Sequence, residues 1–565
     1  MYLGIDLGTT NSLAALFRDG KIEIIPNALG HLLTPSVVSV QDDGTVLTGL
    51  AARESMSTRP HATATAFKRW MGTDRVVKLG GKSFRAEELS AFVLKSLKQD
   101  VEVYLGHPVD SAVITVPAYF NNAQRRATQH AAELAGLKVE RLLNEPTAAG
   151  MAYGLQERTE HNVFLVFDLG GGTFDVSILE YFDGVMQVRA SAGDTRLGGE
   201  DFVAVLETLF LQACTDLSQS EREQLLASHA LWRPAEQAKR DLSDEEQVTM
   251  RFLYGELQLE HTVTRQSFEA ASQGLLEKLR RPIQRALQDA RLAPGELSEV
   301  ILVGGATRMP MIRQTVARLF QRLPLRTINP DETIVHGAAL QAALVARHAA
   351  LEDVVLTDVM PYSLGVVIST DLNGRVLGDQ FSPIIERNTP VPVSRVSDYC
   401  TRADNQTRIL LDIRQGESPV GSENLKLGEL EIEVPSLPAG QAEVNVRMSY
   451  DVSGVLVVDV ENALGKKVSS VVRQSGNAMS EQDIEAALRR LEKIKIHPRH
   501  HQENLYLLER AKRLYEDALG DQRLYIQQHI NAFSLALESQ EERNIAVARQ
   551  VIRDGLEGID TGFVL

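Results

Sequence analysis

The sequence predicts a multidomain fold: a large α/β part, then a domain of antiparallel strands, then a helical part. Three patterns along the chain predict this order. Residues 1 to about 350 alternate short apolar runs with helical stretches, which is typical of α/β domains. From about Val359 to Val472 the apolar residues recur with period two, and after Asn477 they recur as in amphipathic helices. The predicted boundaries are 1–350, 351–358, 359–476 and 477–565.

The length and composition exclude several classes of protein. At roughly 100 to 200 residues per domain, the 565 residues correspond to about three to five domains or subdomains. Apolar residues make up 44% and charged residues 24%, which is typical of a folded globular chain. The 59 Lys and Arg against 75 Asp and Glu give a net charge of −16, which disfavours nucleic acid and anionic membranes as partners.

The cysteine count and the N-terminus indicate the compartment. Cys214 and Cys400 are too few for a disulfide framework and predict a reducing environment. The first residues lack the basic flank and the apolar length of a secretory signal. No apolar run approaches the roughly 18 residues that a membrane helix needs. We therefore expect a soluble cytoplasmic protein.

Two short motifs in the first part share the pattern of an apolar strand followed by Asp-Leu-Gly and Thr. They span Gly4–Asn11 and Val166–Asp175. Glycines let backbone N–H groups approach phosphate oxygens, threonines add hydroxyl donors, and aspartates hold hydrated Mg²⁺ against the phosphates. One Asp-Leu-Gly alone is usually an ordinary turn. Two copies, each closing a strand, predict an internally duplicated domain with a nucleotide between its halves.

A third glycine motif, Ile301–Pro310, again follows a strand and precedes a helix. It is either a tight turn or a place where the backbone approaches a sugar or base, with Arg308 free to stack on it. The duplication favours the second interpretation. Neither a G-x-x-x-x-G-K-[ST] motif nor a properly placed G-x-G-x-x-G motif occurs, so the sequence excludes a P-loop or Rossmann site.

Three further segments of the first part are informative. Residues 121–136 predict a helix that begins at an Asn cap and ends at Gly136. Segments 144–154 and 329–346 are both rich in Ala and Gly, which allows two helices to cross closely and suits a hinge between the halves. The stretch 352–358 has an apolar centre, unlike a flexible spacer, and is expected to dock on a surface.

Long sequence matches show which family the chain resembles. They are "IDLGTTNS", "AVITVPAYFN", "NEPTAA", "DLGGGTFD", "GDTRLGGEDF" and "AEQAKRDLS", and the likeness extends from Gly4 to about Ser475. These segments resemble the 70-kDa heat-shock chaperone family of the DnaK type. The resemblance implies a duplicated actin-like (ribonuclease H-like) ATPase domain, a β-sandwich peptide-binding domain and an α-helical lid. It also implies ATP-driven binding and release of apolar segments of unfolded proteins.

The resemblance implies an ATP site with Mg²⁺ held through water, and K⁺ is a candidate additional cation. The catalytic residues would be Lys68, Glu145, Thr173 and Asp175, while Asp6 and Asp168 would position Mg²⁺. The other residues that would bind ATP or ADP are Gly8, Thr9, Thr10, Asn11, Gly170, Gly171, Gly172, Gly199, Glu236, Lys239, Arg240, Ser243, Gly304, Gly305, Arg308 and Asp331. In isolation, Glu236, Lys239, Arg240 and Ser243 would be a solvated face of one helix.

The resemblance also implies residues for coupling and for peptide binding. Pro117 and Arg125 match positions that relay the nucleotide state, and Val354, Val355, Leu356 and Asp358 match the interdomain linker. The peptide pocket would contain Val366, Ile368, Tyr399, Ile409 and Leu411, beside Arg402, which replaces a usually small or apolar residue. Without the resemblance, these apolar residues would be plain sandwich core. The implied partners are client polypeptides and a J-domain cochaperone.

Several segments depart from the family pattern. Segments 68–89 and 252–260 are shortened in the lobes that exchange factors contact in relatives, so the sequence leaves open whether a nucleotide-exchange factor binds. Segment 368–381 is longer than usual, and the helical end is short. Together these features resemble the specialised bacterial HscC branch of the family.

Two other functions stay open on sequence grounds. A small-molecule kinase on the same ATPase fold would need a second substrate pocket and would phosphorylate a sugar or polyol. An actin-type assembly protein would sediment in an ATP-dependent and concentration-dependent way, although the linker and the β domain argue against it. A metal site at His497, His500 and His501 is disfavoured because the spacing matches no zinc pattern and Pro498 breaks the helix.

Overall fold

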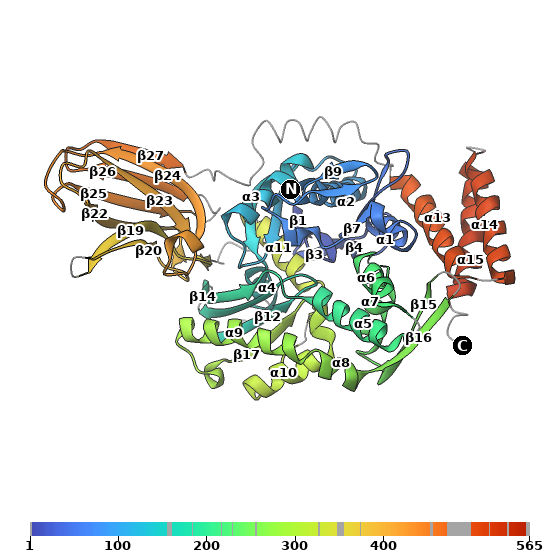
Figure 1. Cartoon of the computed structure of the whole chain (residues 1–565). Coiled ribbons are helices and arrows are strands. Elements are labelled where there is room, and N and C mark those ends of the chain that lie inside the picture. The colour runs from blue at the N-terminus through green and yellow to red at the C-terminus, as the bar shows by residue number, and fades with distance from the viewer. Residues whose placement is uncertain are drawn as a thin grey trace.

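The structure is a computed structural model (Figure 1). It describes residues 3–560 except 155–160, 183–184, 216, 229, 255–256, 326–327, 347–354, 373–374, 452–455, 472–498, 519 and 539–541.

The first part of the chain is built around two six-stranded sheets (Figure 1). The first has the order β11-β10-β1-β2-β3, with β4 paired to β2. Its strands are β1 (Leu3–Asp6), β2 (Asn11–Arg18), β3 (Lys21–Ile25), β4 (Thr34–Pro35), β10 (Ser111–Val116) and β11 (Lys138–Asn144). The second has the order β17-β12-β13-β14-β18-β21. Its strands are β12 (His161–Leu169), β13 (Phe174–Phe182), β14 (Val185–Asp194), β17 (Glu299–Val303), β18 (Val355–Val359) and β21 (Pro390–Val391).

The two sheets share a central arrangement of a hairpin and a parallel strand. In the first, β1 pairs with β2 antiparallel and with β10 parallel. In the second, β12 pairs with β13 antiparallel and with β17 parallel. Both Asp-Leu-Gly motifs therefore lie in the turn of an equivalent hairpin, beside an equivalent parallel strand. This repeated arrangement is what the predicted internal duplication requires.

Helices and small sheets surround these two sheets. The helices are α1 (Gly49–Thr58), α2 (Ala86–Leu105), α3 (Asn122–Leu134), α4 (Glu145–Gly154), α5 (Gly199–Ala213), α6 (Gln219–Ser228), α7 (Trp232–Asp241), α8 (Arg265–Ala271), α9 (Gln273–Ala290), α10 (Pro310–Phe320) and α11 (Thr333–Val345), with short 3-10 turns η1 (Pro60–Ala62), η2 (Phe67–Trp70), η3 (Pro294–Glu296) and η4 (Gly305–Arg308). The small sheets are β5 (Val38–Val40), β6 (Val46–Thr48) and β7 (Thr63–Ala64); β8 (Val77–Leu79) and β9 (Lys82–Phe84); and β15 (Gln247–Tyr254) and β16 (Leu257–Thr264). The predicted caps of α3 are present: the Asn121 side chain accepts from the Gln124 N–H at 3.0 Å, and Gly136 has φ 71°.

The two Ala- and Gly-rich segments form α4 and α11, which cross closely as predicted. A Cβ atom on Gly337 of α11 would lie 1.9 Å from the Ala148 carbonyl oxygen of α4. Where α11 crosses the first sheet, a Cβ on Gly4 would lie 2.4 Å from the Ala339 nitrogen. The absence of side chains at these positions therefore lets α11 lie directly against α4 and β1. The hinge function of this crossing stays a prediction.

The variant Gly337→Ala is expected to lose stability, by about 3 kcal/mol, because the new methyl group meets backbone that cannot yield locally. Gly274 of α9 is the matched control, since no described atom lies within 4 Å of the position of its Cβ. Gly274→Ala should be neutral or gain up to about 1 kcal/mol from helix propensity. Thermal and denaturant unfolding of both variants measures the difference, and equal stability of the two would contradict the close crossing.

The predicted linker docks on the second sheet. Strand β18 pairs in parallel with β14, with Val355 opposite Val185 and Leu356 opposite Met186. It then pairs antiparallel with β21, which places Asp358 opposite Val391. The expectation that the apolar linker docks is thus confirmed for residues 355–357, whereas Val354 lies outside the described residues.

The next part is a pair of four-stranded antiparallel sheets with the orders β20-β19-β23-β24 and β22-β25-β26-β27. Their strands are β19 (Leu364–Leu372), β20 (Arg375–Ile385), β22 (Val393–Cys400), β23 (Arg408–Gln415), β24 (Leu425–Glu433), β25 (Glu443–Tyr450), β26 (Leu456–Asn462) and β27 (Lys467–Val471), and η6 (Gly421–Glu423) precedes β24. Alternate residues of both sheets, such as Leu411, Ile413, Val446 and Val458, form a common core. The period-two pattern correctly predicted these strands.

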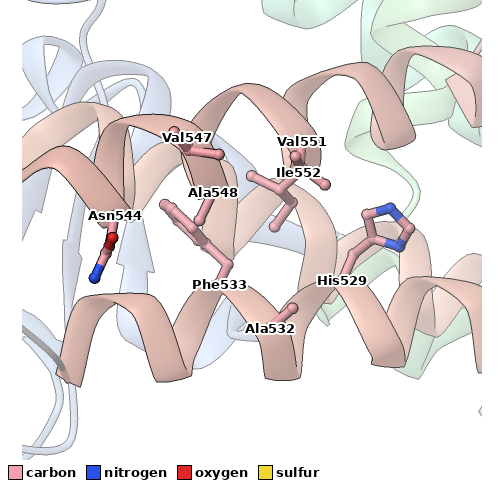
Figure 2. Close-up of a pocket in the computed structure, with 8 residues that line it drawn as sticks. All are labelled: His529, Ala532, Phe533, Asn544, Val547, Ala548, Val551 and Ile552. Carbon is pink, nitrogen blue, oxygen red and sulfur yellow. The ribbon is translucent and has the colours of Figure 1, made fainter.

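The last part contains α13 (Arg499–Asp517), α14 (Gly520–Glu538) and α15 (Glu542–Asp560). Its helices share a core that includes Leu507, Leu514, Phe533 and Leu556. In Figure 1 they lie on the opposite side of the α/β part from the sandwich, and α13 packs against α1. A groove of about 360 Å³ between α14 and α15 is lined by His529, Ala532, Phe533, Asn544, Val547, Ala548, Val551 and Ile552 (Figure 2).

Candidate functional site

A cleft of about 440 Å³ lies between the two halves of the α/β part. It brings together most of the residues that the sequence predicted for nucleotide binding and catalysis. Those that line it are Asp6, Gly8, Thr9, Thr10, Asn11, Lys68, Glu145, Asp168, Gly170, Gly171, Thr173, Gly199, Glu236, Lys239, Arg240, Ser243, Gly304, Gly305, Arg308 and Asp331. They come from both halves of the α/β part, so the site needs residues of both.

The two glycine turns meet in this cleft. A Cβ atom on Gly171 would lie 1.8 Å from the Thr10 hydroxyl oxygen, so only glycine lets the second turn approach the first this closely. Gly304 of the third motif has φ 82°, and a Cβ there would lie 2.4 Å from the Leu169 carbonyl oxygen. Because the turns lie so close together, backbone N–H groups and threonine hydroxyls from both halves line the same cavity. Hydrogen-bond donors of this kind bind phosphate.

Lys68 and Glu145 form a buried ion pair in the cleft. The Lys68 ammonium nitrogen lies 2.7 Å from a Glu145 carboxylate oxygen. Lys68 is 3% exposed and Glu145 is 6% exposed. Turn η2 carries Lys68, and α4 begins at Glu145. The sequence predicted both residues but not their contact.

Three further carboxylates cluster at the ends of the central strands. Burial, followed by the nearby Glu145, raises the pKa of Asp6 to about 7 and that of Asp175 to about 8. The same two causes raise the pKa of Asp168 well above its usual range. The Asp6 carboxylate accepts a hydrogen bond from the Thr115 hydroxyl at 2.8 Å. Asp168 Oδ2 is buried without a hydrogen-bond partner among the described residues. A cleft wall with uncompensated carboxylates fits a divalent cation such as Mg²⁺.

Two predicted residues do not line the cleft among the residues described: Asp175 and Gly172. The Asp175 carboxylate is 2% exposed and accepts a hydrogen bond from the Tyr119 backbone N–H at 3.1 Å. The Gly172 carbonyl oxygen accepts from Arg69 Nε at 3.0 Å, and Arg69 also pairs with Asp201 at 2.5 Å. Arg69 therefore ties η2 of one half to the second glycine turn of the other, a contact that the sequence did not reveal.

Other residues of the cleft form ion pairs. Glu236 pairs with Lys239 at 2.5 Å and with Arg240 at 2.7 Å, so these residues share one face of α7 as predicted. Burial alone would raise the pKa of Glu236, but the two cations lower it below its usual value. Arg308 pairs with Asp331 at 2.6 Å. Carboxylates and a planar guanidinium at one place suit the hydroxyls and the flat base of a nucleoside.

Other residues line the cleft that sequence reasoning missed: Leu13, Leu33, Asp244, Ala306, Met309, Arg313, Pro330 and Ile334. The sequence could have indicated some of these residues. Ala306 and Met309 lie inside the third glycine motif, and Asp244 and Pro330 are next to predicted residues. Leu33 carried no such signal.

The predicted coupling residues form a chain of hydrogen bonds. Arg125 donates to the Ala118 carbonyl oxygen at 3.1 Å and to the Asn144 side chain at 2.6 Å. Asn144 in turn donates to the Asp358 carboxylate of the linker at 2.7 Å. Pro117 begins the turn that contains Ala118, with its carbonyl oxygen bonded to the Phe120 N–H at 3.1 Å. Asn144, which the sequence did not predict, directly precedes Glu145 and links the cleft to the linker.

The predicted peptide-binding residues lie in the sandwich. Val366, Ile409 and Leu411 are buried in its core, and Ile368 and Tyr399 pack against that core. Arg402 is exposed on the loop after β22. Their binding of a peptide stays a prediction.

Two negative expectations concern membranes and metals. Among the described residues, no helix combines the length and apolar character of a membrane span. In the part of the chain that the structure describes, no three His, Cys, Asp or Glu side chains are placed to ligate a metal ion directly, so a cation beside Asp6 and Asp168 would be held through water. The side chains of His497, His500 and His501 lie outside that part.

Comparisons with known proteins cover nearly the whole chain. The family model for "Hsp70 protein" matches residues 2–545. "Chaperone protein DnaK" of Thermotoga neapolitana is 40% identical over 566 aligned positions, which cover 97% of this chain and 92% of the relative. "Chaperone protein DnaK" of Thermosipho africanus is 37% identical over 569 positions, which cover 99% and 92%.

Proposed function

Because this chain belongs to the Hsp70 family, we propose that its ATP-driven cycle is divided among three domains and a linker. Residues 1–350 form an actin-like, ribonuclease H-like ATPase domain, and residues 351–358 are the linker. Residues 359–476 form a peptide-binding β-sandwich, and residues 477–565 form the lid. The central arrangement shared by the two six-stranded sheets supports the first assignment, and the core common to the two four-stranded sheets supports the third.

The chain is a molecular chaperone and an ATPase, which converts ATP and water to ADP and phosphate. Phosphoryl transfer depends on positioning and charge neutralisation more than on covalent chemistry. A bound Mg²⁺ supplies part of that neutralisation, and Asp6 and Asp168 are proposed to hold it through water. Whether K⁺ also binds stays a prediction.

Each wall of the cleft has a proposed role. Backbone N–H groups and hydroxyls of Gly8–Asn11 and Gly170–Thr173 hold the phosphates from two sides. The Lys68 ammonium faces the γ-phosphate, while Glu145 and Asp175 orient the attacking water and accept its proton. Gly199, Gly304 and Gly305 allow close approach of the backbone. The adenosine contacts Glu236, Lys239, Arg240, Ser243, Arg308 and Asp331.

The hydrogen bond between Asn144 and Asp358 carries the proposal that the linker couples the domains. Asn144 adjoins Glu145 and also contacts Arg125, so the docked linker is bonded to the residue beside the proposed catalytic carboxylate. Docking and release of β18 would therefore change how Glu145 is held.

Asp358→Ala is expected to abolish peptide stimulation of ATP hydrolysis, because the linker loses its bond to Asn144. Asp412→Ala is the matched control, since Asp412 pairs with Arg414 of the same strand at 2.7 Å. Steady-state ATPase rates with and without an apolar peptide measure the stimulation. If Asp358→Ala is stimulated as strongly as Asp412→Ala, linker coupling through Asp358 is wrong.

Family membership also suggests partners. We propose apolar segments of client polypeptides as ligands and a J-domain protein as cochaperone, and we leave open whether a nucleotide-exchange factor binds. The likeness to the HscC branch stays a prediction. A small-molecule kinase or an assembly protein gains no support from the comparisons.

A further inference from the structure

Tyr119 lies between the proposed catalytic carboxylate Asp175 and the sandwich. Its backbone N–H donates to Asp175 Oδ1 at 3.1 Å. Its carbonyl oxygen accepts a hydrogen bond from the Tyr362 hydroxyl at 3.2 Å, and the two tyrosine rings lie 4.4 Å apart between centroids. Tyr362 follows the linker strand β18 and leads into β19 of the sandwich. One side chain of the sandwich region thus bonds the residue that holds Asp175.

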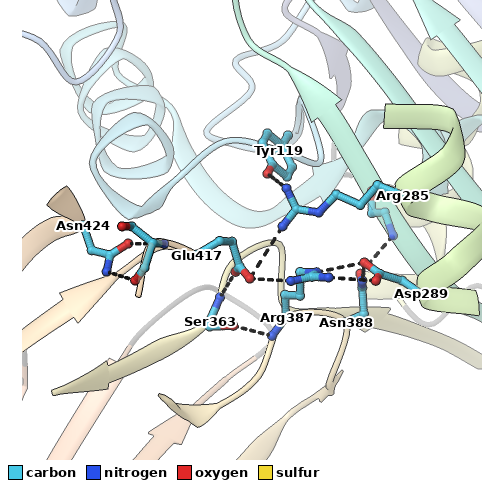
Figure 3. Close-up of polar contacts among 10 residues, drawn as sticks. Tyr119, Arg285, Asp289, Ser363, Arg387, Asn388, Glu417 and Asn424 are labelled. Atoms are coloured by element: carbon cyan, nitrogen blue, oxygen red, sulfur yellow. Dashed lines mark hydrogen bonds and ion pairs between the residues drawn. The ribbon is translucent and has the colours of Figure 1, made fainter. Parts of the chain in front are cut away.

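A polar network fixes this contact (Figure 3). Arg285 of α9 donates to the Tyr119 hydroxyl at 3.0 Å and pairs with Glu417 at 3.5 Å. Glu417 also pairs with Arg387 at 2.6 Å, and Arg387 pairs with Asp289 of α9 at 2.8 Å. Because Arg285 and Asp289 belong to the α/β part, while Glu417 and Arg387 belong to the sandwich region, the network holds the two parts together around the tyrosines.

Tyr119 and Asp175 have little room to move independently. A Cβ atom on Gly193 would lie 2.9 Å from Asp175 Oδ1 and 3.2 Å from the Tyr119 Cβ. Burial, followed by the neighbouring Tyr119 and Asp175, raises the pKa of Tyr362, so its hydroxyl stays protonated and remains a donor. The Tyr119 N–H belongs to the 118–119 peptide, whose Ala118 carbonyl oxygen accepts from Arg125, and the Tyr119 carbonyl oxygen belongs to the 119–120 peptide. The two peptides meet at the Tyr119 Cα atom, so the position of this residue links the Tyr362 hydroxyl to the Asp175 carboxylate.

We propose that Tyr362 is a positioning residue for ATP hydrolysis, whose hydroxyl fixes Tyr119 and thereby keeps the Asp175 carboxylate bonded to the Tyr119 N–H while the sandwich is docked. This inference rests on the proposed role of Asp175 in orienting the attacking water. In the docked structure Asp175 is 2% exposed, and its Oδ1 accepts a hydrogen bond from the Tyr119 N–H. Undocking removes the Tyr362 hydroxyl from the Tyr119 carbonyl oxygen, which loosens Tyr119 and lets Asp175 turn toward the water.

Tyr362→Phe tests the inference because it keeps the ring and removes the hydroxyl. Single-turnover ATP hydrolysis without peptide is expected to accelerate by about three- to tenfold, the range expected for one hydrogen bond. The affinity for ATP should stay unchanged, and the further stimulation by peptide should fall by the same factor. A residue that only stabilises the fold would not separate the hydrolysis rate from the affinity in this way.

Tyr450→Phe is the matched control. The Tyr450 hydroxyl also crosses from the sandwich to the α/β part, but it donates to Asn122 of α3 at 3.0 Å rather than to Tyr119. Energy transfer between dyes on the sandwich and on the α/β part measures docking in both variants. Faster hydrolysis in Tyr362→Phe than in Tyr450→Phe, at equal docking, supports the inference; equal rates, or no change in Tyr362→Phe, overturn it.

Asp175→Asn separates this inference from the proposed function. If Asp175→Asn hydrolyses ATP as fast as the unaltered protein, the role of Asp175 is wrong and the inference falls with it. If Asp175→Asn is inactive and Tyr362→Phe hydrolyses ATP at the same rate as Tyr450→Phe, the proposed role of Asp175 is supported and only the role of Tyr362 is overturned.

Discussion

Replacing Lys68 by alanine is expected to slow single-turnover ATP hydrolysis by about 10²- to 10³-fold, the usual cost of losing one preorganised charge. The Lys68 ammonium is the cation paired with Glu145 at 2.7 Å, in a cleft that also contains Asp6 and Asp168. Without the Lys68 ammonium, the side chains at this part of the cleft wall are carboxylates. They do not stabilise the negative charge that develops on the phosphate. ATP should still bind, because the glycine turns and the adenosine end remain.

The same variant has a separate cost in stability. It leaves Glu145 buried without its cation, which is expected to destabilise the ATPase domain by about 3–5 kcal/mol. The double variant Lys68→Ala/Glu145→Gln should regain much of that stability without regaining hydrolysis. Lys466→Ala is the surface control, since Lys466 is half exposed in its pair with Glu433. Hydrolysis by Lys68→Ala within tenfold of the unaltered protein would contradict the proposed role.

Replacing Glu54 is expected to release the helical part from the ATPase domain. Glu54 of α1 is 3% exposed and accepts hydrogen bonds from Arg513 of α13 at 2.8 Å and from Arg233 of α7 at 2.9 Å. Burial alone would raise the pKa of Glu54, but the two arginines lower it. Glu54→Ala would remove the buried carboxylate from Arg513, which is 6% exposed and keeps a longer ion pair, of 3.4 Å, with Asp517. Docking should weaken by about 3 kcal/mol, or roughly 10²-fold, the lower end of the cost of breaking a buried ion pair.

Energy transfer between dyes on α14 and on the ATPase domain measures this docking. Glu260→Ala is the control, because Glu260 pairs with Arg251 on the exposed surface of β15 and β16. The double variant Glu54→Leu/Arg513→Met should restore docking, since apolar side chains of similar size replace the pair and the partly exposed Arg233 can turn to water. Unchanged docking in Glu54→Ala would contradict the assigned role of this carboxylate.

Local sequence patterns predicted what depends on local structure. The repeated Asp-Leu-Gly turns predicted the duplicated hairpins, and the spacing of Glu236, Lys239 and Arg240 predicted their common face on α7. Glycine and Asn signals placed the ends of α3. In each case neighbouring residues along the chain determine the geometry, so the pattern carries the information.

Contacts between distant segments could not be predicted in this way. Arg513 and Glu54 are 459 positions apart, and Arg387 and Asp289 are 98 positions apart. The hydrogen bond of the Asp175 carboxylate could not be predicted either. Its donor, the Tyr119 N–H, lies 56 positions away in the sequence. Likewise, period-two apolar residues such as Val366 and Leu411 have the same pattern whether they form the core or a peptide pocket.

The most direct test of the coupled chaperone cycle is the dissociation rate of a labelled apolar peptide in ATP and in ADP. The unaltered protein should release the peptide faster in ATP, and Asp358→Ala should release it at similar rates in both nucleotides. Lys68→Ala serves to separate ATP binding from hydrolysis. Equal release in ATP and ADP by the unaltered protein, or hydrolysis of ATP without binding of peptide in either state, would contradict the proposed cycle.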